Sequence, residues 1–293
     1  MTQRRTDLAL EAHSLPKKQA KKLHCVTTWR REVSGYGVDV VEITENGAAE
    51  ALGKPKGQYV TLDLRPYWAH EEDAFQRAVS AVGTELRALL SDVRTALVTG
   101  LGNDAMTPDA IGPQAAEHVL VTRHLMREAG FSALTAVSVL VPGVLGRTGL
   151  EAAEAIRGAV QTVKPDVVIA IDALASRSLE RVCTTVQLSD TGIVPGSGVG
   201  NRRQALNRDS LGVPVIAVGV PTVVDAATLA LDILEEAGAP LSDPSALRGH
   251  GENVMVTPRD IDAQIRELAR IVGYGINLAL QPLSYDDLCA LLG

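Results

Sequence analysis

The apolar residues of this 293-residue chain follow two patterns, and each predicts a different kind of secondary structure. Short runs of consecutive apolar and β-branched residues predict strands that are buried on both faces of a sheet. Longer stretches repeat their apolar positions every three or four residues, as the buried stripe of an amphipathic helix does. The segments that predict strands are 38–43, 59–64, 96–99, 134–141, 166–172, 184–188 and 214–220.

Predicted helices alternate with these strands along most of the chain. Segment 71–90 is an example, with Ala78, Val82 and Leu86 on one stripe, and the other predicted helices are 112–129, 150–163, 223–237 and 258–280. Such alternation predicts an α/β protein with a mostly parallel sheet that helices cover on both faces. Segments 38–43 and 59–64 are expected as a hairpin-like addition beside the main sheet. No linker divides the chain, so we expect a single domain over residues 1–293.

Composition and charge narrow the possible classes of function. The net charge of −7 and the pI near 5.4 provide no basic surface that would bind nucleic acid. We find no signal peptide and no run of about 18 apolar residues, so neither export nor a membrane span is expected. The three cysteines are widely separated and form no zinc motif, which suits a reducing compartment. The pattern predicts a soluble, cytoplasmic protein.

Two of the predicted strands end at aspartates that could carry chemistry. The strand at 96–99 leads into a glycine-rich loop that contains Asp109, and the strand at 166–172 ends on Asp172. In open α/β sheets, ligands bind at the carboxyl ends of the strands. Two carboxylates that lie side by side cannot easily ionise together and therefore hold one proton between them. Such a pair can deprotonate a water molecule while its protonated member polarises a carbonyl group.

Other interpretations of these residues stay open at this point. Asp109 could simply stabilise the first turn of the helix that follows it. The second glycine-rich loop, 190–201, matches no phosphate-binding fingerprint, and its Ser197 lacks the G-x-S-x-G frame of a hydrolase. His118 and His124 follow Asp109 on the predicted helix, so a mixed Asp/His metal site is a further alternative, ranked below the carboxylate pair.

Several long stretches of the sequence resemble one family in the same order along the chain. The chain resembles the germination proteases of spore-forming bacteria, the GPR endopeptidases, over nearly its whole length. The stretches are R-T-D-L-A-L-E at 5–11, G-L-G-N-D-A-M-T-P-D-A-I-G-P at 100–113, P-G-V-L-G-R-T-G at 142–149, I-A-I-D-A-L-A-S-R at 169–177, D-T-G-I-V-P-G-S-G-V-G-N at 190–201 and P-V-I-A-V-G-V-P-T-V-V-D-A at 214–226.

This resemblance implies a fold, an activity and a set of site residues. It implies a three-layer α/β/α sandwich, similar to that of the hydrogenase maturation endopeptidases, and an atypical aspartic protease without cofactor or metal. Its substrates would be the small acid-soluble spore proteins, cut in the spore core during germination. The catalytic pair would be Asp109 and Asp172. Candidate substrate-positioning residues are Gly102, Asn103, Asp190, Gly196 and Ser197.

The resemblance also bears on the amino terminus and on assembly. The family is made as a zymogen, and its acidic-before-apolar cleavage pattern predicts a cut between Asp7 and Leu8 that removes residues 1–7. The family forms homotetramers, so a homotetramer is expected. The alternatives are a metal-dependent maturation peptidase or hydrolase on the same fold and, more distantly, a spore protein that binds its partners without cutting them.

Overall fold

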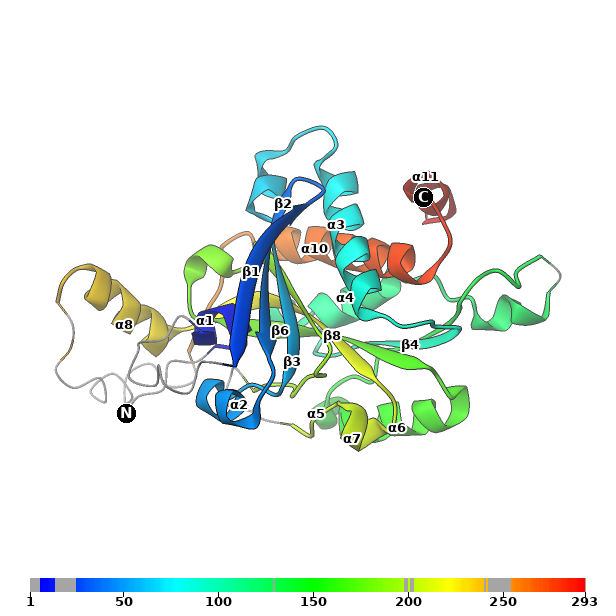
Figure 1. Ribbon diagram of the computed structural model, residues 1–293, viewed down its shortest axis with the longest axis horizontal. Helices are drawn as coiled ribbons and strands as arrows, with labels where there is room; N and C mark the ends of the chain where they lie inside the picture. The colour runs from blue at the N-terminus through cyan, green and yellow to red at the C-terminus, as the bar shows by residue number, and fades with distance from the viewer. Residues whose placement is uncertain are drawn as a thin grey trace.

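A mixed sheet of nine strands forms the centre of the computed structural model, which describes residues 6–13, 25–128, 130–197, 200, 203–239, 241 and 254–292 (Figure 1). The strand order is β1-β2-β3-β7-β8-β6-β4-β5, and β9 pairs with β8. The strands are β1 (Val26–Val33), β2 (Tyr36–Ile43), β3 (Gly57–Asp63), β4 (Thr95–Gly100), β5 (Ala136–Leu140), β6 (Val167–Ser176), β7 (Thr185–Ser189), β8 (Val215–Asp225) and β9 (Met255–Val256).

The prediction of a mostly parallel sheet is wrong, because among the strands of the described residues only β5, β4, β6 and β8 run parallel to one another. The strands β1, β2, β3 and β7 form an antiparallel half that joins the parallel half where β7 pairs with β8. A two-residue turn explains the first reversal, since Ser34 and Gly35 both have positive φ, as a tight hairpin turn requires. The predicted hairpin-like pairing of segments 38–43 and 59–64 is confirmed as β2 and β3.

Strand β1 has no counterpart among the predicted strands. Its sequence, V-T-T-W-R-R-E-V, is polar and charged, and six of its eight residues are exposed. This strand lies at the edge of the sheet, where charged side chains protect against pairing with other chains. An edge strand that is open to water on both faces needs no apolar pattern, so the hydrophobicity of the sequence gives no signal for it.

Helices cover the parallel half of the sheet on both faces. The helices α3 (Ala74–Leu89), α4 (Ile111–Glu117) and α10 (Ile261–Leu280) pack together on one face, and α6 (Ala152–Val163) packs on the other (Figure 1). Strand β4 alternates accordingly, because Val98 belongs to the first core and Leu97 packs with Ile156 in the second. The other α-helices of the described residues are α1 (Ala9–His13), α2 (Asn46–Leu52), α5 (Leu145–Thr148), α7 (Arg208–Leu211), α8 (Ala226–Glu236) and α11 (Tyr285–Leu292).

The predicted helix 112–129 is shorter in the structure. Helix α4 ends at Glu117, and a 3-10 helix, η4 (Arg123–Arg127), follows after a break. The break is held by the side chain of Asn277, whose Oδ1 accepts from the Leu120 N–H at 2.8 Å. Its Nδ2 donates to the His118 carbonyl, also at 2.8 Å. Because a side chain of α10 satisfies these backbone groups, the chain can leave the helix without losing hydrogen bonds.

The predicted helix 223–237 begins later than expected. Residues 223–225 continue strand β8, and α8 begins at Ala226 with Asp225 as its cap. The Thr228 N–H donates to Asp225 Oδ1 at 2.9 Å, which satisfies one of the free donors at the start of the helix. None of the helices in the described part of the chain has the length and apolar character that a membrane crossing requires.

Candidate active site

The late parts of β6 and β8 and the loop after β4 border a cavity of about 410 Å³. Its lining includes both predicted catalytic aspartates, Asp109 and Asp172, although 63 positions separate them in the sequence. It also includes Gly102 and Gly196 from the two glycine-rich loops. The position of this cavity agrees with the rule that ligands bind at the carboxyl ends of parallel strands.

The prediction that the strand ends on Asp172 is wrong, because β6 continues to Ser176 by pairing with β8. Asp172 is a buried carboxyl group within this strand, with 5% of the residue exposed. Its Oδ1 accepts one hydrogen bond from the Ala173 N–H at 3.0 Å. Burial raises the pKa of Asp172 well above its ordinary value, and the negative charges of Asp109 and then Asp7 raise it further. Asp172 therefore favours the protonated form at a pH where an exposed aspartate is ionised.

Asp109 reaches the same cavity from a short 3-10 helix, η3 (Thr107–Asp109), which precedes α4. Its carboxyl group is partly buried, and this burial raises its pKa, while the Asn103 N–H has the opposite effect. The segment that carries Asp109 is held by strand β8, because the Thr222 hydroxyl donates to the Pro108 carbonyl at 2.6 Å. The site therefore contains two neighbouring carboxyl groups whose pKa values are both raised by burial.

Two glycines bring Asp109 to this position. Gly102 has φ +110°, and a Cβ added there would lie 2.1 Å from the Asp109 carbonyl oxygen. A Cβ at Gly112 would lie 2.1 Å from the Leu101 carbonyl oxygen and 2.6 Å from that of Ile171. A side chain at either position would thus push the Asp109 segment away from the ends of β4 and β6.

The predicted substrate-positioning residues occupy different places. Gly102 and Gly196 line the cavity with the aspartates. Asn103 instead folds its own loop, since its Oδ1 accepts from the Ala105 N–H at 3.1 Å. Asp190 is exposed and accepts from the Gln58 N–H at 2.8 Å, outside the lining of this cavity. Ser197 lines an adjacent cavity, and residues 198, 199, 201 and 202 of its loop lie outside the described residues.

A third carboxylate, Asp7, lines the same cavity as the predicted pair. Its Oδ2 accepts from the Ala175 N–H at 2.9 Å, and its Oδ1 accepts from the Ser197 hydroxyl at 2.7 Å. The Leu8 side chain that follows is completely buried. The structure thus places the peptide bond that is predicted to be cut next to the cavity of the aspartate pair.

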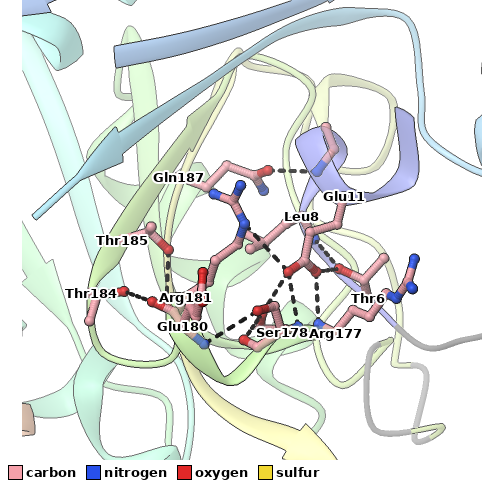
Figure 2. A network of polar contacts seen from close by, with 12 residues as sticks. Thr6, Leu8, Glu11, Arg177, Ser178, Glu180, Arg181, Thr184, Thr185 and Gln187 are labelled. Carbon is pink, nitrogen blue, oxygen red and sulfur yellow. Dashed lines mark hydrogen bonds and ion pairs between the residues drawn. The ribbon is translucent and has the colours of Figure 1, made fainter. Parts of the chain in front are cut away.

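Glu11 anchors the segment that carries Asp7, in a network shown in Figure 2. Its carboxylate accepts from the Ser176 hydroxyl at 2.9 Å, the Arg177 N–H at 2.7 Å and the Ser178 N–H at 3.1 Å. Arg181 adds an ion pair at 3.6 Å, and the Thr6 hydroxyl also donates to Glu11. No role for Glu11 was predicted, although its presence in the stretch 5–11 was a usable signal.

The described residues contain no cluster of side chains that would support the metal alternative. No group of three or more His, Cys, Asp and Glu side chains suited to a metal ion occurs among them. His118 packs against the Tyr274 ring at 6.2 Å between centroids, and neither it nor His124 lines the cavity. The pair of carboxyl groups is thus not extended by the histidines on which that alternative was based.

Fold and site together describe an α/β protein with paired carboxyl groups in a cavity at its strand ends, and comparisons with known proteins identify the family. The family model described as germination protease, Peptidase_A25, matches residues 4–237. A germination protease from Caldanaerobacter subterraneus is 42% identical over 308 residues, covering 95% of this chain and 94% of the relative. One from Bacillus subtilis is 37% identical over 342 residues, covering 94% and 93%.

The chain belongs to the germination protease family, and it is therefore an endopeptidase. Another relative, a germination protease from Clostridium perfringens, is 40% identical over 309 residues, with 95% of each chain covered. Among solved structures, the NiFe hydrogenase maturation protease HycI from Thermococcus kodakarensis matches with a TM-score of 0.37 and 16% identity, over 66% of this chain and 99% of that one.

Proposed function

We propose that the Asp109–Asp172 pair activates the water molecule with which this protease hydrolyses peptide bonds. The observation that carries the proposal is that both carboxyl groups line one cavity, where burial and the charge of Asp109 raise the pKa of Asp172. Such a pair shares a proton, and the more deeply buried Asp172 holds it. The ionised Asp109 then takes a proton from water, and the resulting hydroxide attacks the carbonyl carbon of the peptide.

The proposed substrates are the small acid-soluble spore proteins, which the protease would cut in the spore core during germination. Membership of the germination protease family supports this proposal. The protein is also proposed to act as a homotetramer and to consist of one domain.

The proposed architecture is a three-layer α/β/α sandwich, similar to that of the hydrogenase maturation endopeptidases. The helices on both faces of the parallel strands support it.

The first cut is proposed to fall in the chain itself, between Asp7 and Leu8, and to remove residues 1–7. The position of Asp7 in the lining of the cavity supports this cut. The docking of Glu11 on residues 176–178 supports it as well, because it holds the following residues in place. This proposal makes the amino-terminal segment the first substrate that the carboxyl pair encounters.

The test of this function is cleavage of a purified small acid-soluble spore protein, with the cut mapped by mass spectrometry. Asp109→Asn and Asp172→Asn are each expected to lower the rate at least about 100-fold, because each removes one member of the acid–base pair. Asp104→Asn is the matched control, since Asp104 is an exposed residue of the same loop outside the cavity lining. Cleavage that survives both cavity substitutions would reject the proposal, and activity lost to a chelator and restored by zinc or nickel would favour the metal alternative.

A further inference from the structure

Two side chains donate hydrogen bonds to the carbonyl oxygen of Asp7. Lys54 Nζ lies 2.7 Å from this oxygen, and Gln187 Nε2 lies 3.3 Å from it. This oxygen belongs to the peptide bond that is proposed to be cut. We propose that Lys54 and Gln187 form an oxyanion site, which stabilises the negative charge that develops on the substrate carbonyl oxygen during hydrolysis. The inference rests on the proposed cut between Asp7 and Leu8.

Gln187 contacts the backbone on both sides of the bond between Asp7 and Leu8. Its Oε1 accepts from the Ala9 N–H at 2.9 Å while its Nε2 donates to the Asp7 carbonyl, so one amide group holds the chain on both sides of Leu8. Gln187 comes from β7 and is buried, with 7% exposed, and Figure 2 shows it directed toward the segment that carries Leu8. A buried amide normally has its hydrogen bonds satisfied, and the backbone of residues 7–9 satisfies this one.

Asp7 lies between the two donors and the carboxylate pair. Lys54 and Gln187 line a second cavity, of about 280 Å³, and Asp109 and Asp172 line the first. Asp7 is one of the two residues that line both, the other being Leu174. In the proposed reaction, water activated in the first cavity attacks the carbonyl carbon while the two donors hold the carbonyl oxygen.

Hydrolysis of the bond between Asp7 and Leu8 at this site needs no reactant other than water. The oxygen of water forms a bond to the Asp7 carbonyl carbon, and the π electrons of the carbonyl group move onto the oxygen held by Lys54. When the tetrahedral intermediate collapses, the bond to the Leu8 nitrogen breaks. The proton from water passes through the carboxylate pair to that nitrogen. The second proton of water stays on the new acid, so the products are a new carboxyl group on the Asp7 backbone carbon and a free amine on Leu8.

The test follows self-cleavage of the full chain, made by cell-free translation, as a first-order rate measured by mass spectrometry. Lys54→Met is expected to lower this rate about 100- to 1,000-fold, the effect of losing one oxyanion donor in other proteases. Lys54→Arg keeps a donor and is expected to retain more activity than Lys54→Met. Lys56→Met is the matched control, because Lys56 is an exposed lysine that lines neither cavity.

A second measurement separates catalysis from simple anchoring of the segment. In a chain whose cleavage is blocked by Asp172→Asn, hydrogen exchange at the amides of residues 7–9 is compared with and without Lys54→Met. Unchanged exchange together with slow cleavage supports the oxyanion role. Unchanged cleavage overturns it, and so does a loss of protection that parallels the loss of rate, because Lys54 would then only hold the segment.

The same experiment distinguishes failure of this inference from failure of the proposed function. If the wild-type chain cuts between Asp7 and Leu8, and Asp109→Asn abolishes the cut while Lys54→Met leaves its rate unchanged, only the oxyanion site is wrong. If the wild-type chain makes no cut there, or still makes it with Asp109→Asn, the proposed function fails and this inference fails with it.

Discussion

Asp7 and Ala175 are joined by two hydrogen bonds in opposite directions, although 168 positions separate them in the sequence. The Asp7 N–H donates to the Ala175 carbonyl at 2.8 Å, and the Ala175 N–H donates to Asp7 Oδ2 at 2.9 Å. Because Ala175 lies three residues after Asp172 on β6, these bonds fix the amino-terminal segment close to the buried carboxyl group. The residue before the proposed cut is thus held by both its backbone and its side chain.

The first prediction concerns the carboxylate of Asp7. Asp7→Ala is expected to slow self-cleavage about 10- to 100-fold, because the Ala175 N–H and the Ser197 hydroxyl lose their charged acceptor. Ser197→Ala removes only one of the two donors, so a smaller loss is expected. The rates are measured on full-length chains by mass spectrometry. A rate for Asp7→Ala equal to that of the wild type would show that the acidic side chain is not recognised.

The second prediction concerns the pH dependence of stability. The pKa of Asp172 is raised in the folded chain, mainly by burial, while the unfolded chain has the ordinary value. The folded state therefore holds a proton that the unfolded state releases, so stability is highest below the ordinary pKa and falls as pH rises toward the folded pKa. Asp172→Asn removes this dependence and is expected to raise the free energy of unfolding at pH 7, because a buried amide does not have to take up a proton on folding.

Urea unfolding of the wild type and of Asp172→Asn at pH 7 and pH 4 measures this effect. The difference between the two chains is expected to shrink at pH 4, close to the ordinary pKa of aspartate, because the unfolded-state carboxyl group is then partly protonated as well. Asp104→Asn, which removes an exposed carboxylate, serves as the control. A difference between wild type and Asp172→Asn that stays constant with pH would contradict the buried, protonated state.

The third prediction concerns Glu11, the anchor of the amino-terminal segment. Glu11→Gln loses the negative charge that accepts from the Arg177 and Ser178 N–H groups, and it is expected to cost about 1–3 kcal/mol of docking free energy. The measurement is hydrogen exchange of residues 6–13, which are expected to exchange faster. Glu50→Gln, at an exposed position of α2, is expected to change nothing. Unaltered protection in Glu11→Gln would mean that other contacts hold the segment.

The fourth prediction concerns the backbone near Asp109. Gly102→Ala is expected to abolish most of the activity, because its Cβ would meet the Asp109 carbonyl oxygen at 2.1 Å and displace the carboxyl group. Gly149→Ala provides a matched comparison, since Gly149 also has positive φ, at +74°, but has open space around it. The control should lose only about 1–2 kcal/mol of stability and keep its activity. Equal activities of the two variants would show that the close approach at Gly102 does not matter.

Local patterns were sufficient for the parallel half of the molecule. The strands at 96–99 and 166–172 were predicted because a strand covered on both faces must be apolar along its length. A catalytic role was predicted at the carboxyl ends of these segments because a polar aspartate follows an apolar run there. The structure lines one cavity with Asp109 and Asp172, although Asp172 lies within β6 and Asp109 lies on the short helix η3 rather than at a strand end.

Where the prediction failed, distant residues decide the conformation. The end of α4 depends on Asn277, more than 150 positions away, and no pattern within 112–129 reports it. Strand β1 of the antiparallel half was missed because this exposed edge strand carries no apolar signal. In both cases the free energy comes from contacts that form only when the chain is folded.

The sequence by itself determined which segments are buried strands, which two carboxyl groups were candidates for catalysis, and which family the chain resembles. Only the tertiary structure decided that Asp7 lies at the same cavity as those carboxyl groups, with Lys54 and Gln187 on its carbonyl oxygen. The physical reason is that burial and element type depend on neighbouring residues in the chain. Hydrogen bonds between side chains and a distant backbone depend instead on how the whole sheet brings separate segments together.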